Sequence, residues 1–229
     1  MTKASASLPQ ELIDRSIYRR GTLAVFDRIE PKKTALMVID MQNAWLVPGA
    51  PFHTPPTLTI VPAINRLVEA LRSRGGLVAW FRHTTGAPGT DTYWGHYFEN
   101  FVSADKRGEA IEALLEGRPT HDVYSGFDIR AEDLVLPKYR FSAFLKNTVD
   151  VEKLFRERGI DTVIVVGTAT NVGCESTIRD AMMLDFKTFM PHDAVVAAYE
   201  DGHLASMRSV MQTFADVRPV DELIGIMGE

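Results

Sequence analysis

Short runs of apolar residues recur along the chain and alternate with longer amphipathic segments. Five runs have the length and composition of β-strands that are buried on both faces. These runs are residues 34–40, 77–81, 133–137, 162–166 and 187–190. Strands of this kind belong to parallel sheets, because helices cover both faces of such sheets. The pattern therefore predicts a central, mostly parallel sheet.

The segments between these runs show helical spacing of their apolar residues. In the first of them Ile64, Leu67, Val68 and Leu71 repeat at helical intervals, and the pattern stops at a Gly-Gly pair. The predicted helices are 60–74, 106–116, 149–158, a segment that ends at residue 184, and 201–214. Strands that alternate with helices predict an α/β fold of three layers, α/β/α, with right-handed crossovers.

The 229 residues, of which 45% are hydrophobic, can bury one large core. We find no repeat and no Gly-, Ser- or Pro-rich linker, so residues 33–229 are expected to form one domain. Residues 1–32 are mixed and polar, and we expect an N-terminal arm that lies over the surface or over a partner subunit. The long segment 84–101, rich in Gly, Thr and aromatic residues, is a candidate lid.

Charge and cysteine content narrow the classes of function. The formal net charge is −5 and basic residues are interleaved with acidic ones, so nucleic acid is not expected as a partner. No stretch approaches the roughly 18 apolar residues of a membrane span, and no secretory signal is evident, so we expect a cytoplasmic protein without a membrane partner. The single cysteine, Cys174, agrees with a reducing compartment; it is either a reactive group or a buried apolar thiol.

Polar residues stand at the ends of three predicted strands. Asp40 closes the first strand, Lys138 follows the third, and a turn at residues 168–174 follows the fourth. Sites form at the carboxyl ends of parallel strands, where a carboxylate beside an ammonium can exchange protons with a substrate. Amides at the start of a helix favour developing negative charge. Each feature alone has an ordinary structural interpretation as a turn, a surface charge or a helix cap; together they indicate a hydrolytic centre.

Three segments resemble the signature motifs of isochorismatase-like hydrolases, also called cysteine hydrolases. They read LMVIDMQNAW, LPKYRFSAF and VVGTATNVGCESTIRDAMMLDFK, and the likeness spans residues 34–221. It implies a Rossmann-like topology and a catalytic Asp, Lys and Cys triad, of which Asp40 and Lys138 match the first two. The segments look most like the ureidoacrylate amidohydrolase branch, whose substrates carry a ureido or carbamoyl group.

The third triad position departs from the family pattern. The spacing in G-x-x-T-x-x-C places the nucleophile at Gly173, and Cys174 stands one residue later. One residue on a helix corresponds to a rotation of about 100°, so the Cys174 thiol is expected to point elsewhere. The chain is then an inactivated variant that has lost its nucleophile, a natural glycine form like the true isochorismatases, or a relative with a shifted nucleophile or no catalysis.

The resemblance also implies a non-proline cis peptide between Thr168 and Ala169, with the amides of Ala169 and Gly173 as oxyanion donors. Side chains near the three motifs are candidates for substrate contact. They are Gln42, Asn43, Trp45, His83, Tyr93, Trp94, Tyr139 and Arg140. Some relatives, the nicotinamidases, hold a metal, but His53, His83 and His96 lack ligand spacing, so neither a metal nor another cofactor is expected.

The expected function is hydrolysis of a C–N bond in a small amide, ureido or carbamoyl compound. One alternative is a vinyl ether hydrolase of the isochorismatase type, in which Asp40 is a general acid and no covalent intermediate forms. The other is a non-catalytic binding relative. The resemblance further implies a homo-oligomer, either a dimer or a tetramer.

Overall fold

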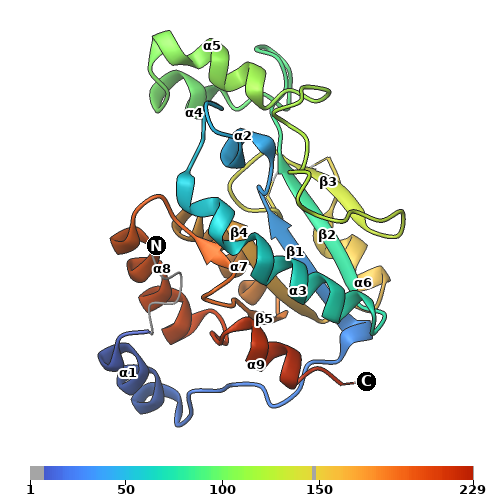
Figure 1. Ribbon diagram of the computed structural model, residues 1–229, viewed down its shortest axis with the longest axis vertical. Helices are drawn as coiled ribbons and strands as arrows, with labels where there is room; N and C mark the ends of the chain where they lie inside the picture. Colours follow the sequence, from blue (N-terminus) through green and yellow to red (C-terminus); the bar gives the residue numbers. More distant parts are fainter. Residues whose placement is uncertain (1–7, 146–147, 229) are drawn as a thin grey trace.

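The computed structural model describes residues 8–145 and 148–228, and a parallel sheet lies at its centre (Figure 1). The strands follow the order β3-β2-β1-β4-β5, and β6 pairs with β4. Their bounds are β1 Thr34–Ile39, β2 Leu77–His83, β3 Leu134–Lys138, β4 Thr162–Thr168, β5 Lys187–Phe189 and β6 Val195–Val196. Each pairing between these strands is parallel, and all six residues of β1 are buried. The predicted α/β fold with a mostly parallel sheet is confirmed.

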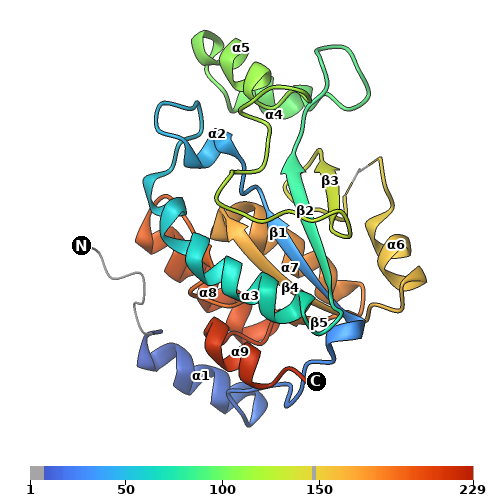
Figure 2. The same ribbon diagram turned by 45° about the vertical axis from the view of Figure 1, so that its right-hand side comes forward.

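Helices cover both faces of the sheet and extend beyond one end of it. The longer helices are α1 Gln10–Arg20, α3 Val61–Arg72, α5 Ala104–Ala113, α6 Val151–Glu157, α7 Glu175–Met183 and α8 Glu200–Thr213. Short helical segments are α2 Asn43–Leu46, α4 Gly95–Asn100, α9 Val220–Gly225, and the turns η1 Pro31–Lys33, η2 Pro55–Ile60 and η3 Thr170–Cys174. Figure 2 shows α2, α4 and α5 gathered beyond the carboxyl ends of β1 and β2.

Alternate residues of β1, β2 and β4 contribute to two separate cores. Met37 and Ile39 pack in a cluster that includes residues of α6, α7 and α8, whereas Leu36 and Val38 pack in a cluster that includes residues of α3 and α9. This alternation is the two-residue period of a strand. It explains why the apolar runs were continuous, because both faces of the sheet are covered.

Helix α3 shows how local sequence determines the buried face and the end of a helix. Its buried side chains are Ile64, Leu67, Val68 and Leu71, the positions that the apolar spacing predicted. The chain then turns at Gly75, whose φ of +79° favours glycine, and a Cβ on Gly76 would meet the Leu71 side chain at 2.4 Å. The Gly-Gly pair therefore ends the helix and lets β2 begin close beside it.

The N-terminal segment contains helix α1, which lies against α8 of the same chain. Glu11 forms an ion pair with Arg208 at 2.5 Å, and Arg20 Nη1 donates to the carbonyl of Met211 at 2.8 Å. The sequence pattern did not predict α1, because its mean hydropathy is low and only Leu12 and Ser16 are buried. Residues 1–7 of the expected arm, and residue 229 at the end of the expected domain 33–229, lie outside the described residues.

The remaining differences concern short elements. The candidate lid 84–101 contains α4, and the sequence analysis also did not anticipate α2, α9 and the two-residue strand β6. The turn after β4 is a π-helix, η3, rather than the first turn of α7. In the described ranges, the helices are too short or too polar to cross a lipid bilayer.

Candidate active site

Asp40 stands where the central strand β1 ends. Its backbone has φ +54°, unusual for a residue with a side chain, and its amide donates to the Phe81 carbonyl at 3.0 Å. The residue is 4% exposed. Its Oδ2 lies 3.0 Å from the Lys138 ammonium, while Oδ1 is buried with no hydrogen-bond partner among the described residues.

Lys138 closes β3 and is fully buried. Because β2 separates β3 from β1, the Lys138 side chain meets Asp40 across an intervening strand. Nζ contacts three acceptor atoms: Asp40 Oδ2 at 3.0 Å, the Arg140 carbonyl at 3.0 Å and His83 Nδ1 at 3.2 Å. The structure therefore brings together the two charged residues that the sequence placed on separate strand ends.

His83 ends the intervening strand β2, in register with Lys138. Its Nδ1 is 3.8 Å from Asp40 Oδ2, and the residue is 5% exposed. Burial, and then the neighbouring Lys138 cation, lower the pKa of His83 below its ordinary value. The imidazole is therefore neutral at neutral pH.

The turn after β4 brings Gly173 beside Asp40. The peptide between Thr168 and Ala169 is cis, as the resemblance implied. An ideal Cβ on Gly173 would lie 3.2 Å from Asp40 Oδ2 and 3.0 Å from Cγ2 of Ile39. The Gly173 carbonyl accepts a hydrogen bond from Thr177 Oγ1 at 2.7 Å. A side chain at position 173 would thus start directly at the carboxylate.

Cys174 is a buried core residue. It is 0% exposed and packs in the cluster that contains Ile39 and Ile178. Burial, and then the Asp40 charge, raise the pKa of the Cys174 thiol well above its ordinary value. A buried thiol with a raised pKa is a poor nucleophile at neutral pH.

Two of the candidate binding residues near Asp40 have other contacts. The Gln42 side chain is fully buried; its amide nitrogen donates to the carbonyls of His83 and His121, and its oxygen accepts from the His83 amide. All of these groups are backbone, so the Gln42 side chain holds the end of β2 in place, and its expected contact with a substrate stays a prediction. Asn43 Nδ2 donates to the Pro119 carbonyl at 2.7 Å.

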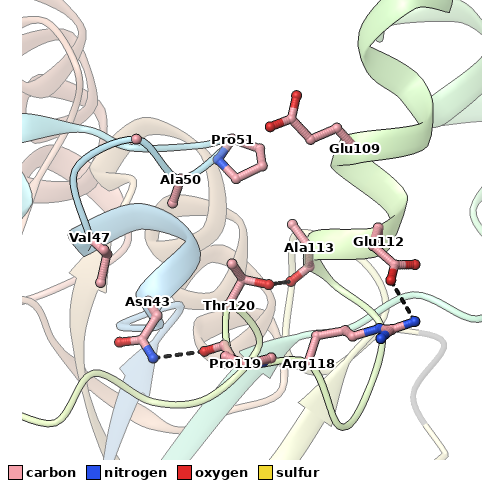
Figure 3. A pocket seen from close by; sticks show the side chains of 11 residues that line it. Asn43, Val47, Ala50, Pro51, Glu109, Glu112, Ala113, Arg118, Pro119 and Thr120 are labelled. Carbon is pink, nitrogen blue, oxygen red and sulfur yellow. Dashed lines mark hydrogen bonds and ion pairs between the residues drawn. The ribbon is translucent and has the colours of Figure 1, made fainter.

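Asn43 also lines a cavity of about 550 Å³ between the loop after α2 and helix α5 (Figure 3). The loop after α2 forms one wall with Ala50 and Pro51, and α5 forms another with Glu109 and Ala113. The residues that line it do not include Asp40, Lys138 or Gly173. The cavity is therefore distinct from the site at the strand ends.

Aromatic side chains gather beside His83. Trp94 packs edge-on against Phe141 with ring centroids 4.7 Å apart, and the Arg140 guanidinium lies 4.9 Å from the Trp94 ring. Trp45 and Phe141 flank the His83 ring at 6.0 and 6.3 Å. Phe141 was not singled out from the sequence, although its place in the LPKYRFSAF motif was a usable signal.

Tyr93 and Tyr139 make no ring contact with His83 among the described residues. Tyr93 stacks on the fully buried Phe98, in a small cluster formed with residues of α5. Tyr139 lines a second cavity, of about 440 Å³, together with Thr84 and Thr85. Through Phe98 and Tyr97, Tyr93 is connected to the aromatic group beside His83, whereas Tyr139 lines this second cavity.

One buried histidine escaped the sequence analysis. His121 is fully buried, and its Nε2 lies 2.8 Å from Thr84 Oγ1. Burial, together with the Arg82 cation, lowers its pKa to about 4. Its contact with Thr84 supports the end of β2. No motif near residue 121 indicated this role. In the described part of the chain, no group of three or more His, Cys, Asp or Glu side chains is arranged to hold a metal ion.

Comparison with known proteins agrees with this geometry. Residues 34–222 match the model of the isochorismatase domain family. The chain belongs to the isochorismatase family of hydrolases. Among curated relatives, a ureidoacrylate amidohydrolase RutB from Klebsiella pneumoniae subsp. pneumoniae is 33% identical over 177 residues, which are 72% of this chain and 73% of the relative.

Solved structures of the isochorismatase family share the fold. A cysteine hydrolase from Pseudomonas syringae pv. phaseolicola 1448A superposes with a TM-score of 0.79 at 28% identity, covering 89% of this chain and 96% of that one. An isochorismatase family protein from Desulfovibrio vulgaris subsp. vulgaris has a TM-score of 0.73 at 27% identity, covering 85% and 97%. The family and the three-layer fold thus rest on sequence and structure alike.

Proposed function

We propose that this hydrolase cleaves a C–N bond in a small amide, ureido or carbamoyl compound, with Asp40 as its acid–base group and water as the nucleophile. The observation that carries the proposal is Asp40 Oδ1, a buried carboxylate oxygen without a partner in the described residues. Buried polar atoms in native proteins are nearly always hydrogen-bonded, and an exception calls for an explanation such as a catalytic role. The substrate class follows from the ureidoacrylate amidohydrolases that are 33% identical to this chain.

The two oxygens of Asp40 have different roles in this proposal. Oδ2 is engaged by Lys138 at 3.0 Å, which holds the carboxylate in one orientation. Oδ1 is then the oxygen that takes a proton from the attacking water. A fixed carboxylate of this kind is an effective general base when the proton lies within hydrogen-bond reach.

The family position for the nucleophile falls on Gly173, so the chain offers no thiol there. The water oxygen adds to the carbonyl carbon while its proton passes to Asp40. The C–N bond then breaks, and Asp40 returns the proton to the leaving nitrogen. The backbone amides of Ala169 and Gly173 are proposed to donate to the oxyanion, at the start of the turn that begins with Thr168.

Arg140, Trp94 and Trp45 are proposed to contact the part of the substrate that does not react. The Arg140 guanidinium is planar and can bind a substrate carboxylate through two parallel hydrogen bonds. It already lies against the Trp94 ring at 4.9 Å, so a flat substrate fits between the aromatic group and the charged pair. Tyr93 and Tyr139 are further candidates for contact with the substrate.

A second candidate function is hydrolysis of a vinyl ether. The glycine at position 173 favours it, because a reaction without a covalent intermediate needs only Asp40 as general acid and a water. The third possibility, a binding protein without catalysis, keeps the same pocket but turns nothing over. All three use the same charged pair and differ in what happens to the bound molecule.

The deciding experiment is a turnover screen. Ammonia release from ureido and carbamoyl compounds is measured for the chain, for Asp40→Asn and for Cys174→Ala. The proposal expects turnover that is lost in Asp40→Asn and kept in Cys174→Ala. Loss of turnover in Cys174→Ala, with folding intact, would overturn the role of water and point to a shifted thiol nucleophile.

A matched pair of variants tests position 173. Gly173→Cys places a thiol beside Asp40, and Gly173→Ala places the same Cβ there without a thiol. If the chain is inactive and Gly173→Cys alone releases ammonia, the chain is an inactivated amidase rather than a water-dependent one. If the chain cleaves a vinyl ether but no C–N bond, the second function replaces the first, and binding without turnover in every form supports the third.

We also propose that the chain forms a homo-oligomer, a dimer or a tetramer. Exposed apolar side chains on the outer helices support this, among them Tyr18, Phe101 and Met183. Sedimentation velocity measures the state directly. A purely monomeric species at micromolar concentration contradicts the proposal.

A further inference from the structure

The hydrogen bonds of Lys138 determine the chemical form of His83. An ammonium group has three N–H donors and no acceptor. The three atoms around Lys138 Nζ are Asp40 Oδ2, the Arg140 carbonyl oxygen and His83 Nδ1. All three donors of Lys138 are therefore assigned, and one of them is directed at the imidazole.

Because Lys138 can only donate, His83 Nδ1 has to accept and cannot carry a hydrogen. In a neutral imidazole the hydrogen then sits on the other nitrogen, Nε2. The charged groups that face His83 are Lys138 and Arg140, which disfavour its protonation, and Asp40, which favours it. Burial and Lys138 prevail, so the pKa of His83 lies below its ordinary value. The pKa of the neighbouring His121 is lowered as well.

The Nε2–H group has no acceptor in the described part of the chain. No hydrogen bond joins Nε2 to another described residue, and this atom is not among the fully buried polar atoms that lack a partner. Trp45 and Phe141 lie beside the ring at 6.0 and 6.3 Å and carry no acceptor for it. Nε2–H is thus a donor that retains contact with accessible space next to Asp40.

We infer that Lys138 fixes His83 in its Nε2–H form and that this hydrogen is donated to an oxygen of the bound substrate. The second half of this inference rests on the proposed function, whereas the first half concerns the resting protein. It refines the substrate class: the molecule places a carbonyl or carboxylate oxygen, and not an N–H or ammonium group, at this edge of the site. His83 becomes a side-chain donor in addition to the backbone amides of the turn.

Nitrogen NMR of the whole chain with ¹⁵N-labelled histidine tests the first half without any turnover. The His83 signals are assigned by their loss in His83→Gln. We expect a protonated Nε2 and an unprotonated Nδ1 between about pH 6 and pH 8. In Lys138→Met we expect the proton to move to Nδ1 or to exchange between the two nitrogens. A proton on Nδ1, or on both nitrogens at neutral pH, overturns the inference.

Titration with acetamide, acetate and methylammonium tests the second half. Acetamide and acetate offer an oxygen acceptor, and their binding is expected to shift the Nε2–H signal, whereas methylammonium leaves it in place. His121 is the matched control, because it is buried and neutral but its Nε2 already contacts Thr84. A shift of His121 alone, or no shift of His83 with either acceptor at saturation, contradicts a substrate-binding role.

Where turnover is found, kinetics separate positioning from donation. Loss of a preorganised donor costs on the order of 100-fold in kcat/KM, and we expect this for His83→Phe. His83→Gln retains an N–H near the same place and is expected to recover activity to within about 10-fold of the chain. Equal losses in both variants indicate a structural role. If no compound is turned over, the proposed function fails while the NMR result still decides the form of His83.

Discussion

Two buried ion pairs in this molecule differ in how completely their carboxylates are satisfied. Asp216 Oδ2 accepts from the backbone amides of Val25 and Phe26 at 2.7 and 3.0 Å, and Arg218 holds both carboxylate oxygens. Asp40 has Lys138 on one oxygen and no described partner on the other. The two carboxylates are similarly buried, at 0% and 4% exposed.

Burial and pairing therefore do not distinguish these two ion pairs, whereas the completeness of the carboxylate's hydrogen bonds does. Asp216 and Arg218 hold residues 25 and 26 at the sheet edge beyond β5. Both carboxylate oxygens of Asp216 accept hydrogen bonds. The Asp40 pair lies where three strand ends converge, and its Oδ1 has a hydrogen-bonding capacity that no described residue uses. A buried charge whose hydrogen bonds are incomplete is expensive to keep unless it has a use.

The sharpest test of the comparison is Asp40→Asn. We expect activity to fall by about 10³ to 10⁴, because a general acid–base group contributes rate factors of that order. The fold should be retained, since the amide is nearly isosteric with the carboxylate, but Lys138 loses its counterion, so the free energy of unfolding should fall by about 3 to 5 kcal/mol. Steady-state kinetics and circular dichroism measure the two effects, and substantial residual turnover would sink the acid–base role.

The matching change in the other pair is Asp216→Asn. It leaves Arg218 buried without its counterion and weakens two backbone contacts. A loss of about 3 to 5 kcal/mol in the free energy of unfolding is expected, as for other broken buried pairs. Urea denaturation gives this value. Turnover per folded molecule should stay near that of the unchanged chain, and a selective loss of catalysis would contradict the comparison.

Lys138→Met should combine both kinds of effect at intermediate size. The Asp40 carboxylate loses its partner and its fixed orientation, so we expect a loss of about 10²-fold in activity and about 2 to 3 kcal/mol in stability. Lys138→Arg serves as the control that keeps the charge but not the shape. Full activity of the methionine variant would show that Asp40 needs no positioning.

Acidification should lower stability through the buried histidines. The pKa of His121 is about 4 in the folded chain and near its ordinary 6.5 in the unfolded one, so the unfolded chain binds more protons in between. This stability is present above about pH 6.5 and is lost as the pH falls toward 4, by about 2 kcal/mol. Urea midpoints at successive pH values measure the slope. His121→Gln should flatten it, and an unchanged slope would contradict the assignment to His121.

The smallest effect is expected from Cys174→Ala. The thiol is buried among core residues and its pKa is raised, so catalysis should change by less than about 3-fold. Stability should fall by about 1 kcal/mol through lost packing. Reaction with a thiol reagent offers an independent check, because the native chain should be modified only as fast as it unfolds.

Much of the fold could be read from periodicity. The five apolar runs became β1 to β5 within a few residues of the expected bounds, since a strand buried on both faces leaves an unbroken apolar signal. Helix α1 left no such signal, because it covers the surface of α8 with few buried residues. The short elements α2, α4 and β6 depend on contacts with distant segments, and propensity over four to six residues is too weak to reveal them.

The candidate site was predicted in part. Asp40 and Lys138 were identified from their places at strand ends and from motifs, and they meet at 3.0 Å. Gln42 sits in the same motif as Asp40, yet its amide serves the backbone of β2. The motif alone could not separate these two roles, because both residues are polar and buried and only Met41 stands between them. His121 contributes from a loop with no recognisable pattern.

The sequence by itself determined the alternation of strands and helices, the family motifs and the glycine at position 173, because these depend on the order and type of neighbouring residues. Only the tertiary structure decided which polar atoms find partners. Lys138 reaches Asp40 across β2, and the two residues are 98 positions apart in the chain, so their pairing comes from strand order and not from local sequence. A hydrogen bond requires its donor and acceptor atoms to be placed within a few tenths of an ångström and in the right direction. This placement is set by the packing of the whole sheet.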